Sequence, residues 1–225
     1  MRMKLKTNAG VVVWAVCLTV VPARGVVVGT TDTFQDGSSH DWDGGIDAYV
    51  PTGGPAGDGD QFVRVGSGSF SSVPNLAIFN EAARWQGDYT AAGATTLSAD
   101  VKVLDGSALD LRAVLFGGNS GASRATSTTS VLVPADGQWH HVTFDITAAG
   151  LTVVFDFDGI SNLLASVNRI MLRHQGGPPA SGGTAVSAWV GFDNIAVTPE
   201  PAALLLCVFG CLTTVLRRPG TQTTA

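Results

Sequence analysis

The chain has 225 residues, of which only 14% are charged, against about 25% in an average soluble domain. This length suits one domain or at most two small ones. Because the 13 Lys and Arg residues are scattered along the chain and 18 acidic residues outnumber them, the composition excludes a strongly basic nucleic-acid-binding protein, and we expect no nucleic-acid partner.

The first 23 residues have the pattern of a secretory signal peptide. Three basic residues lie within the first six positions, and residues 11–21 form an apolar run broken only by one Thr. The sequence Val-Pro-Ala that ends at Ala23 is a small-residue site for signal peptidase. A membrane-spanning helix needs roughly 20 apolar residues, so the shorter run favours a cleaved signal over a permanent anchor.

Most of the following sequence is typical of β-strands with one face in a core and one face in water. In 96–104, for example, every second residue is apolar, and no long stretch has helical periodicity. Turn residues such as Asp-Gly pairs separate the predicted strands. The strands that we predict are 46–50, 61–65, 75–79, 96–104, 109–115, 127–133, 140–146, 151–155, 167–173 and 188–193.

This pattern predicts an all-β fold, a two-sheet antiparallel sandwich of jelly-roll type. The Ser/Thr/Gly-rich segment 119–129 is predicted to be a mobile loop or a weak edge strand. All three Cys residues lie in the terminal segments, so stability of the region between them depends on burial rather than on disulfides. Residues 24–198 carry 17 acidic and 8 basic side chains, a net charge near −9.

The C-terminus combines three features in a fixed order. A Pro-Glu-Pro tripeptide precedes the apolar segment 202–216, which as a helix would reach only ~22 Å, short of a ~30 Å hydrocarbon core. An Arg pair follows. This arrangement resembles the PEP-CTERM sorting signal of Gram-negative bacteria that make exopolysaccharide. The residues that carry the resemblance are Pro199, Glu200, Pro201, Arg217 and Arg218.

The resemblance implies transient membrane anchoring, an inner-membrane intermediate, and processing by an exosortase near the Pro-Glu-Pro. It also implies release to the cell surface or extracellular matrix. We therefore expect an exported protein with a signal peptide at 1–23, a β-sandwich domain at 24–198 and a sorting segment at 199–225 with a short hydrophobic helix.

Short motifs in the predicted domain carry a second resemblance. They are Asp-Thr-Phe-Gln-Asp-Gly at 32–37 with Trp42, Gly-Asp-Gly-Asp-Gln-Phe-Val-Arg-Val at 57–65, Asp-Gly-Gln-Trp-His at 136–140, and Gly-Phe-Asp-Asn-Ile-Ala-Val at 191–197. Together they resemble the galactose-binding-like jelly roll of bacterial carbohydrate-binding modules. The resemblance implies that the first and last strands lie together and hold one structural calcium.

For that calcium the resemblance places Asp36 and Asp193 as carboxylate ligands, with Asp32 as a further choice. Gln35 stands where many relatives have an acid, which removes one charge from the implied site. Calcium takes six to eight oxygen ligands, several of them carboxylates or carbonyls. The competing interpretation is that these aspartates form turns and keep an exported protein soluble.

Aromatic residues could form a platform for a sugar ring. Trp85 lies in a segment where polar and aromatic residues alternate, and we predict that it stacks on a sugar, with hydrogen bonds from Arg84, Asp88 or Asn80. The alternative is that the large aromatic residues fill the core of the sandwich. By the alternation, Trp139 and Trp189 fall on the face opposite their apolar neighbours.

Catalytic patterns are weak in this sequence. Glu81 is the only Glu between residues 24 and 198, and no nucleophile elbow is present. We therefore expect a non-enzymatic, surface-sorted protein that binds polysaccharide or matrix components. Two alternatives remain: a structural protein that self-associates through sheet edges without sugar affinity, and a polysaccharide-modifying enzyme with two carboxylates converging in a groove.

Overall fold

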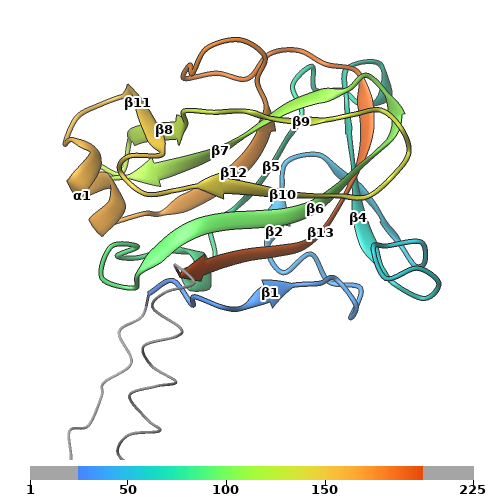
Figure 1. Cartoon of the computed structure of the whole chain (residues 1–225), viewed down its shortest axis with the longest axis horizontal. Coiled ribbons are helices and arrows are strands. Elements are labelled where there is room, and N and C mark those ends of the chain that lie inside the picture. The colour runs from blue at the N-terminus through green and yellow to red at the C-terminus, as the bar shows by residue number, and fades with distance from the viewer. Residues whose placement is uncertain (1–24, 200–225) are drawn as a thin grey trace, which may run out of the picture.

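The computed structural model describes residues 25–199, which form a sandwich of two antiparallel sheets (Figure 1). The first sheet has the strand order β10-β6-β13-β4-β3, with β1 paired to β13. Its strands are β1 (Thr31–Asp32), β3 (Ile46–Val50), β4 (Phe62–Ser67), β6 (Ala94–Gly106), β10 (His140–Asp145) and β13 (Ala188–Pro199).

The second sheet has the order β11-β8-β7-β12-β5-β2, with β9 paired to β7. Its strands are β2 (Trp42–Asp43), β5 (Ala77–Asn80), β7 (Leu109–Gly117), β8 (Ser123–Ser127), β9 (Val131–Val133), β11 (Leu151–Phe155) and β12 (Arg169–His174). Three short helices complete the described chain: the 3-10 helices η1 (Gly68–Phe70) and η2 (Ala83–Trp85), and α1 (Ile160–Ala165). The predicted all-β jelly-roll sandwich is confirmed.

The core lies between the sheets and is built from the apolar members of each alternating strand. On β6 and β7 these residues are almost fully buried, and β13 contributes Val190 and Phe192. Burial of apolar area between two sheets is the main source of stability in a domain without disulfides. The inward residues of β6 and β7 are Leu97, Ala99, Val101, Val103, Leu109, Leu111, Ala113 and Leu115.

Most predicted strands match observed ones, and β11 covers the same five residues as its prediction. The prediction for 119–129 is wrong, because this segment contains β8, which is hydrogen-bonded to β11 on one side and to β7 on the other. Its small polar side chains are buried and bond to the backbone: the hydroxyl of Thr126 donates to the carbonyl of Ala113 at 3.0 Å. The predicted strand 127–133 is divided, since β8 ends at Ser127 and β9 begins at Val131.

The first and last strands pair directly, as the resemblance to carbohydrate-binding modules implied. Thr31 lies opposite Ala196, and Asp32 lies opposite Ile195. Between Asp193 and Ala196 the register of β13 against β6 shifts, and Asn194 has a left-handed backbone with φ of 49°. Asp193 lies opposite Asp100 at the start of this bulge and is fully buried, with an exposed fraction of 0%.

The two terminal predictions lie almost wholly outside the described residues. These are the signal peptide at 1–23 and the segment from Glu200 through Pro201, the apolar run and the Arg pair; only Pro199 is described, at the end of β13. Within 25–199, no helix has the length and apolar character needed to cross a membrane.

Candidate functional site

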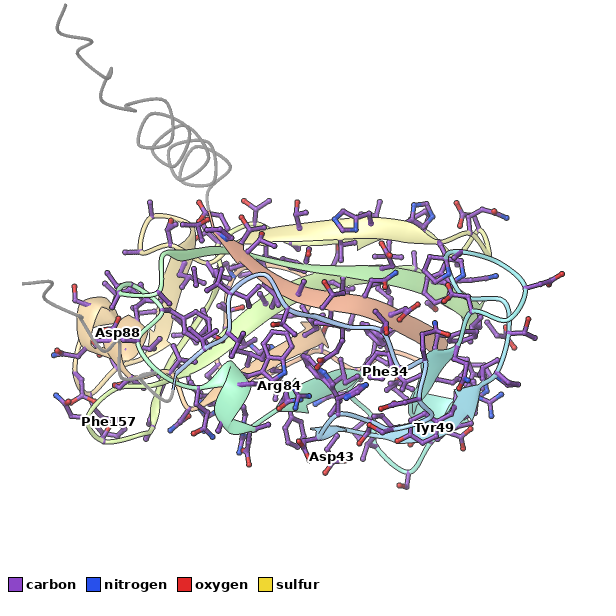
Figure 2. The ribbon with its side chains drawn as sticks, turned by 90° about the horizontal axis from the view of Figure 1, so that it is seen from below. Phe34, Asp43, Tyr49, Arg84, Asp88 and Phe157 are labelled. Atoms are coloured by element: carbon purple, nitrogen blue, oxygen red, sulfur yellow. The ribbon has the colours of Figure 1, made fainter. Side chains whose placement is uncertain are left out.

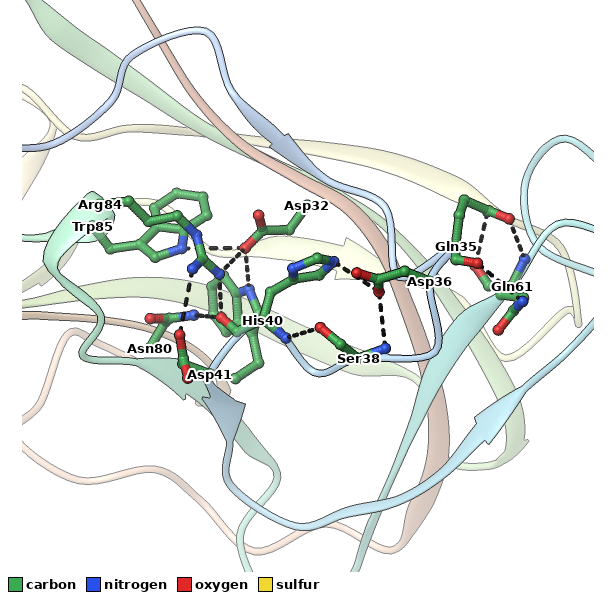
Figure 3. A network of polar contacts seen from close by, with 11 residues as sticks. Asp32, Gln35, Asp36, Ser38, His40, Asp41, Gln61, Asn80, Arg84 and Trp85 are labelled. Carbon is green, nitrogen blue, oxygen red and sulfur yellow. Dashed lines mark hydrogen bonds and ion pairs between the residues drawn. The ribbon is translucent and has the colours of Figure 1, made fainter.

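The structure places Trp85 in the core rather than on a surface. Its exposed fraction is 3%, and its indole lies beside Asp32 and Arg84 (Figure 3). Its ring packs edge-on against that of Trp42, with the two centroids 5.3 Å apart. A buried indole has no free face for a sugar ring, so the prediction of ring stacking by Trp85 is wrong. The alternative, in which large aromatic residues fill the sandwich, describes this position.

A buried carboxylate explains why the two indoles lie there. The Oδ2 atom of Asp32 accepts hydrogen bonds from Nε1 of Trp42 at 2.8 Å, from Nε1 of Trp85 at 3.2 Å, and from Nη2 of Arg84 at 3.0 Å. Arg84 also donates to the carbonyl of His40 and lies 3.4 Å from Asp41. Asp32 therefore connects β1 of the first sheet to β2 and η2, and its donors leave it no role in an exposed site.

The other two predicted ligand-binding residues are used locally as well. Asn80 is fully buried; its Nδ2 donates to the carbonyl of His40 at 2.8 Å, and its Oδ1 accepts from the backbone N–H of Ala82 at 2.7 Å. Asp88 is exposed and accepts from the backbone N–H of Ala91 at 2.8 Å, which stabilises a turn. Figure 2 shows Asp88 apart from Arg84, so the four predicted residues do not form one binding surface.

The three predicted calcium ligands are separated too. Asp36 is exposed, accepts from the backbone N–H of Ser38 at 2.9 Å, and lies 3.3 Å from Nε2 of His40. The hydrogen bond from Ser38 is the largest of the effects that lower the pKa of Asp36. Among residues 25–199, no three His, Cys, Asp or Glu side chains are grouped closely enough to hold a metal ion. Asp36, Asp193 and Asp32 thus do not form a ready-made carboxylate cage.

Asp193 differs from the other two because one of its oxygens is free. Its Oδ1 accepts from the backbone N–H of Asn194 at 2.8 Å, whereas its buried Oδ2 has no partner among the described residues. Burial raises the pKa of Asp193 to about 7, and the charges of Asp60 and Asp100 add to the increase. A buried carboxylate oxygen without a donor fits a bound cation, which would then need its other ligands from carbonyl oxygens or water.

The outer face of the second sheet carries a row of alternating phenylalanine and arginine side chains. Phe155 lies opposite Arg124, Arg124 lies opposite Phe116, and Phe116 lies opposite Arg169 on successive strands. Phe79 on β5 continues the row, since the guanidinium of Arg169 also lies over its ring. We call these five residues the Phe–Arg row. It crosses four strand spacings, ~19 Å at ~4.8 Å each.

Cation–π contacts connect neighbouring members of the row. The guanidinium carbon of Arg124 lies 5.6 Å from the ring centroid of Phe155 and 5.1 Å from that of Phe116. The corresponding distances for Arg169 are 4.9 Å to Phe116 and 5.1 Å to Phe79. Each such contact contributes about 0.5–1 kcal/mol at an exposed site and holds the guanidinium in a fixed place.

Two hollows lie along the row, and both are lined by Phe116, Arg124 and Arg169. The larger, about 480 Å³, adds side chains from the η2 and β7–β8 regions and from the start of β12: Glu81, Gln86, Gly121, Ala122 and Asn168. The smaller, about 290 Å³, is lined further by Asn75, Leu76, Ala77, Met171, Arg173, Ser181 and Gly183. The row therefore runs between two open cavities with polar walls.

A second arginine pair lies on the same face. Arg112 on β7 is directly opposite Arg173 on β12, an arrangement of like charges that normally destabilises a sheet. Burial, followed by the charges of Arg124 and Arg112, lowers the pKa of Arg173 to about 10. Both arginines donate to backbone carbonyls; Arg112 bonds those of Ser127 at 2.6 Å, Thr128 at 2.8 Å and Gly177 at 2.8 Å.

Sequence analysis missed this face, although one signal was present. Three outward positions of the predicted strands are occupied by arginine: Arg112, Arg169 and Arg173. Any kind of polar residue is expected at a water-facing position, so repeated arginine there is a signal. Arg124 lay in the segment that was predicted to be a loop or an edge strand. Only the pairing of β8 with β7 and β11 brings it between two phenylalanines.

No protein-family model matches the chain, and no curated protein matches its sequence. Among solved structures, an agarase, AgWH50C, superposes with a TM-score of 0.51 at 10% identity over 79% of this chain. The match covers 25% of the agarase, so the chain spans about a quarter of that protein's length. At this identity the likeness shows the fold alone.

Two further structures have lower scores. The family 11 carbohydrate-binding module of the cellulase Lic26A-Cel5E of Clostridium thermocellum has a TM-score of 0.48 at 12% identity, over 77% of this chain and 96% of that chain. CtCBM11 in solution has a TM-score of 0.49 at 16% identity, over 76% of this chain and 94% of that chain.

Proposed function

We propose that this protein binds polysaccharide on the outer face of its second sheet, without catalysing a reaction. The observation that carries the proposal is the Phe–Arg row between two cavities of about 480 and 290 Å³. The exposed ring of Phe155 can contact the C–H face of a pyranose, and the guanidinium groups of the row can donate to its oxygens, whereas the buried ring of Phe116 holds the two arginines in place. The similarity to the agarase supports the fold only. The proposal about the ligand rests on the geometry of the row.

Exposed aromatic residues extend the row at one end. Phe155 and Phe157 have exposed fractions of 45% and 61%, and their rings meet edge to face with centroids 4.9 Å apart. What sets these two rings apart from other exposed apolar side chains is that they touch and so form a contiguous patch. They provide a contact surface beside Arg124 for a chain that lies along the row.

The lining of the larger cavity favours binding over hydrolysis. Glu81 is its one acidic residue within the described chain, and that carboxylate is paired with Arg169. Glycosidases need two carboxylates on either side of the scissile bond. The geometry thus supports a binding module rather than a polysaccharide-modifying enzyme.

Affinity electrophoresis of the purified full chain through gels containing soluble polysaccharides, the host's own exopolysaccharide included, tests the proposal. The protein is expected to be retarded, and Phe155→Ala is expected to reduce the retardation. Tyr49→Ala is the matched control, because Tyr49 has a similar exposed fraction of 41% and lies at the opposite end of the molecule from Phe157 (Figure 2). Equal loss with both variants, or no retardation by any polysaccharide, would contradict the proposal; in the latter case a self-associating structural protein becomes the leading account.

We further propose that a structural calcium binds at the bulge of β13, with Asp193 as a carboxylate ligand through its free oxygen. When bound, the cation would offset the buried charge and fix β13 in place. Asp36 and Asp32 are not part of this proposal, since their oxygens already accept hydrogen bonds elsewhere. Repeating the electrophoresis in EDTA separates the two proposals: retardation that persists in EDTA keeps polysaccharide binding and makes the cation dispensable for it.

Export and sorting remain proposals that rest on the terminal sequences. In that account signal peptidase removes 1–23 and an exosortase acts near Pro199, so the domain reaches the cell surface or matrix. The binding face lies on the second sheet, whereas both ends of the described chain lie at β1 and β13 of the first sheet (Figure 1). Attachment through the C-terminus would thus leave the Phe–Arg row open to a polysaccharide.

A further inference from the structure

We propose that the polysaccharide bound at the Phe–Arg row is anionic, with carboxylate or sulfate groups that pair with Arg124 and Arg169. This inference rests on the proposed function and narrows it to a class of ligand. It is carried by the distribution of charge over the described chain, by the partners that each arginine has, and by the position of a single acid at the rim of the cavity.

Positive charge is concentrated on the face that carries the row. Residues 25–199 contain only seven Lys and Arg side chains against 17 acidic ones. Four of the seven lie on the outer face of the second sheet: Arg112, Arg124, Arg169 and Arg173. A strongly acidic domain that gathers most of its cations on one sheet face has a local field opposite to its overall charge, which attracts anions to that face.

Arg169 pairs with Glu81, whereas the other three arginines on this face form no ion pair with a carboxylate among residues 25–199. The arginines outside this face do have acidic partners. Arg64 pairs with Asp47, and Arg84 pairs with Asp32 at 3.0 Å. Arg124, by contrast, forms no ion pair with any carboxylate among residues 25–199 and contacts the rings of Phe116 and Phe155.

The deeper pair, Arg112 and Arg173, is held without carboxylates. Arg173 donates to Oε1 of Gln175 at 2.6 Å and to the backbone carbonyl of Ser181 at 3.0 Å. Neutral acceptors leave the full charge of both guanidinium groups in place. The acids on or beside this face are Asp110 next to Arg112, Asp43 opposite Phe79, and Glu81. Two more, Asp156 and Asp158, follow Phe155 and accept hydrogen bonds from nearby backbone and Ser groups.

Guanidinium groups suit carboxylate and sulfate better than they suit neutral hydroxyls. Their planar donors form two parallel hydrogen bonds to such oxyanions, and charge-assisted bonds are roughly twice as strong as neutral ones. The stacked rings position the guanidinium planes before a ligand arrives. A row with alternating rings and cations therefore matches a polysaccharide with alternating pyranose faces and acidic substituents.

Glu81 occupies the place that a ligand's anionic group would take. It lines the larger cavity and pairs with Arg169 from the opposite wall. With no ligand bound it balances part of the local charge, and an incoming carboxylate must compete with it. Replacement of Glu81 by a neutral amide should therefore strengthen the binding of an acidic polymer, whereas it should leave a neutral polymer unaffected.

The test uses one polysaccharide in two charge states: polygalacturonate and the same polymer after methyl esterification. The purified full chain is immobilised, and retention of each polymer is measured at low and high salt. We expect polygalacturonate to be retained at least tenfold better than the ester and to be released by salt, because salt screens exposed charges. Inorganic polyphosphate, a polyanion without sugar rings, is the third probe and is expected to be retained less than polygalacturonate.

Variants separate the contributions of the arginines. Arg124→Gln is expected to reduce retention of polygalacturonate by about tenfold, and Glu81→Gln is expected to increase it. Arg64→Gln is the matched control: Arg64 also lies over an aromatic ring, 4.5 Å from the centroid of Trp189, but it is on the first sheet and has Asp47 as a partner. Retention by Arg64→Gln should equal that of the parent.

The outcomes distinguish this inference from the function on which it rests. Equal retention of the acidic and esterified polymers, both reduced by Phe155→Ala, would keep polysaccharide binding and overturn the anionic preference. Polyphosphate held as tightly as polygalacturonate would also overturn the inference, because it would reduce the site to general attraction of polyanions. If neither polymer is retained, and the host's own exopolysaccharide is not retained either, both proposals are overturned.

Discussion

Two regions of this protein combine arginine with aromatic rings, and they differ in how the arginine charge is met. Around Asp32, one carboxylate accepts hydrogen bonds from Arg84 and from two indoles, and the group lies between the sheets. In the Phe–Arg row, Arg124 has rings on either side and no described carboxylate beside it. The first region gives its arginine a carboxylate partner and holds the fold, whereas the second leaves Arg124 without one and open to an acidic ligand.

The sharpest test of this difference is Asp32→Ala. The substitution leaves a partly buried cation and two indole N–H groups without their shared acceptor, so we expect the free energy of unfolding to fall by about 3–5 kcal/mol. Urea denaturation measures this loss. Asp36→Ala removes an exposed carboxylate four residues along the chain and should leave the unfolding midpoint where it is. If Asp32→Ala had no effect on stability but reduced polysaccharide retention, the comparison would be wrong. The region around Asp32 would then be a binding site rather than a structural one.

Asp193 gives the next largest effect, and its sign follows from its raised pKa. The carboxyl titrates near 3.8 in an unfolded chain and near 7 in the folded one, so the folded state holds the proton more tightly. In EDTA, stability should therefore be highest below about pH 4 and decrease as pH rises toward 7. The loss is about 4 kcal/mol at about 1.4 kcal/mol per pKa unit.

Asp193→Asn removes this titration and should raise the melting temperature at pH 8 in EDTA. Thermal unfolding from pH 4 to pH 8 checks both curves. Added calcium should stabilise the parent and have no such effect on the variant. A parent whose stability in EDTA increases from pH 4 to pH 8 more than that of Asp193→Asn would contradict the burial of an uncompensated carboxylate.

The smallest effect is expected at Arg64, which stacks on Trp189 as the row arginines stack on phenylalanines. Because it is partly exposed and paired with Asp47, Arg64→Gln should cost at most about 1 kcal/mol of stability. Polysaccharide retention should not change. Thermal unfolding and retention, measured side by side, decide this. A loss of retention here would mean that stacking, rather than unmatched charge, marks the binding face.

Alternation of apolar and polar residues was sufficient to predict the class of fold. Strands such as β6 and β10 bury one face and leave the other more exposed to water, so their period of two is visible in the sequence. The segment of β8 escaped because its inward residues are Ser and Ala, which have no apolar signal, and because its stability comes from strands on both sides. The pairing of β1 with β13 followed only from the resemblance to carbohydrate-binding modules.

The candidate site could not be predicted in the same way. The sequence around Trp85 and Asp88 suggests an exposed platform. In the structure this segment forms η2 and a turn, and the indole of Trp85 is buried in the core. Members of the Phe–Arg row, in contrast, come from five strands and are separated by up to 90 positions, from Phe79 to Arg169. Strand register brings them together, and register is a property of the folded sheet rather than of any local segment.

Side-chain NMR of the arginine Nε–H groups during titration with oligogalacturonate tests the central claim most directly. We predict that the signals of Arg124 and Arg169 shift and saturate together, whereas those of Arg64 and Arg84 stay in place. Shifts confined to Arg84, or shifts equal for all arginines, would contradict a binding face on the second sheet.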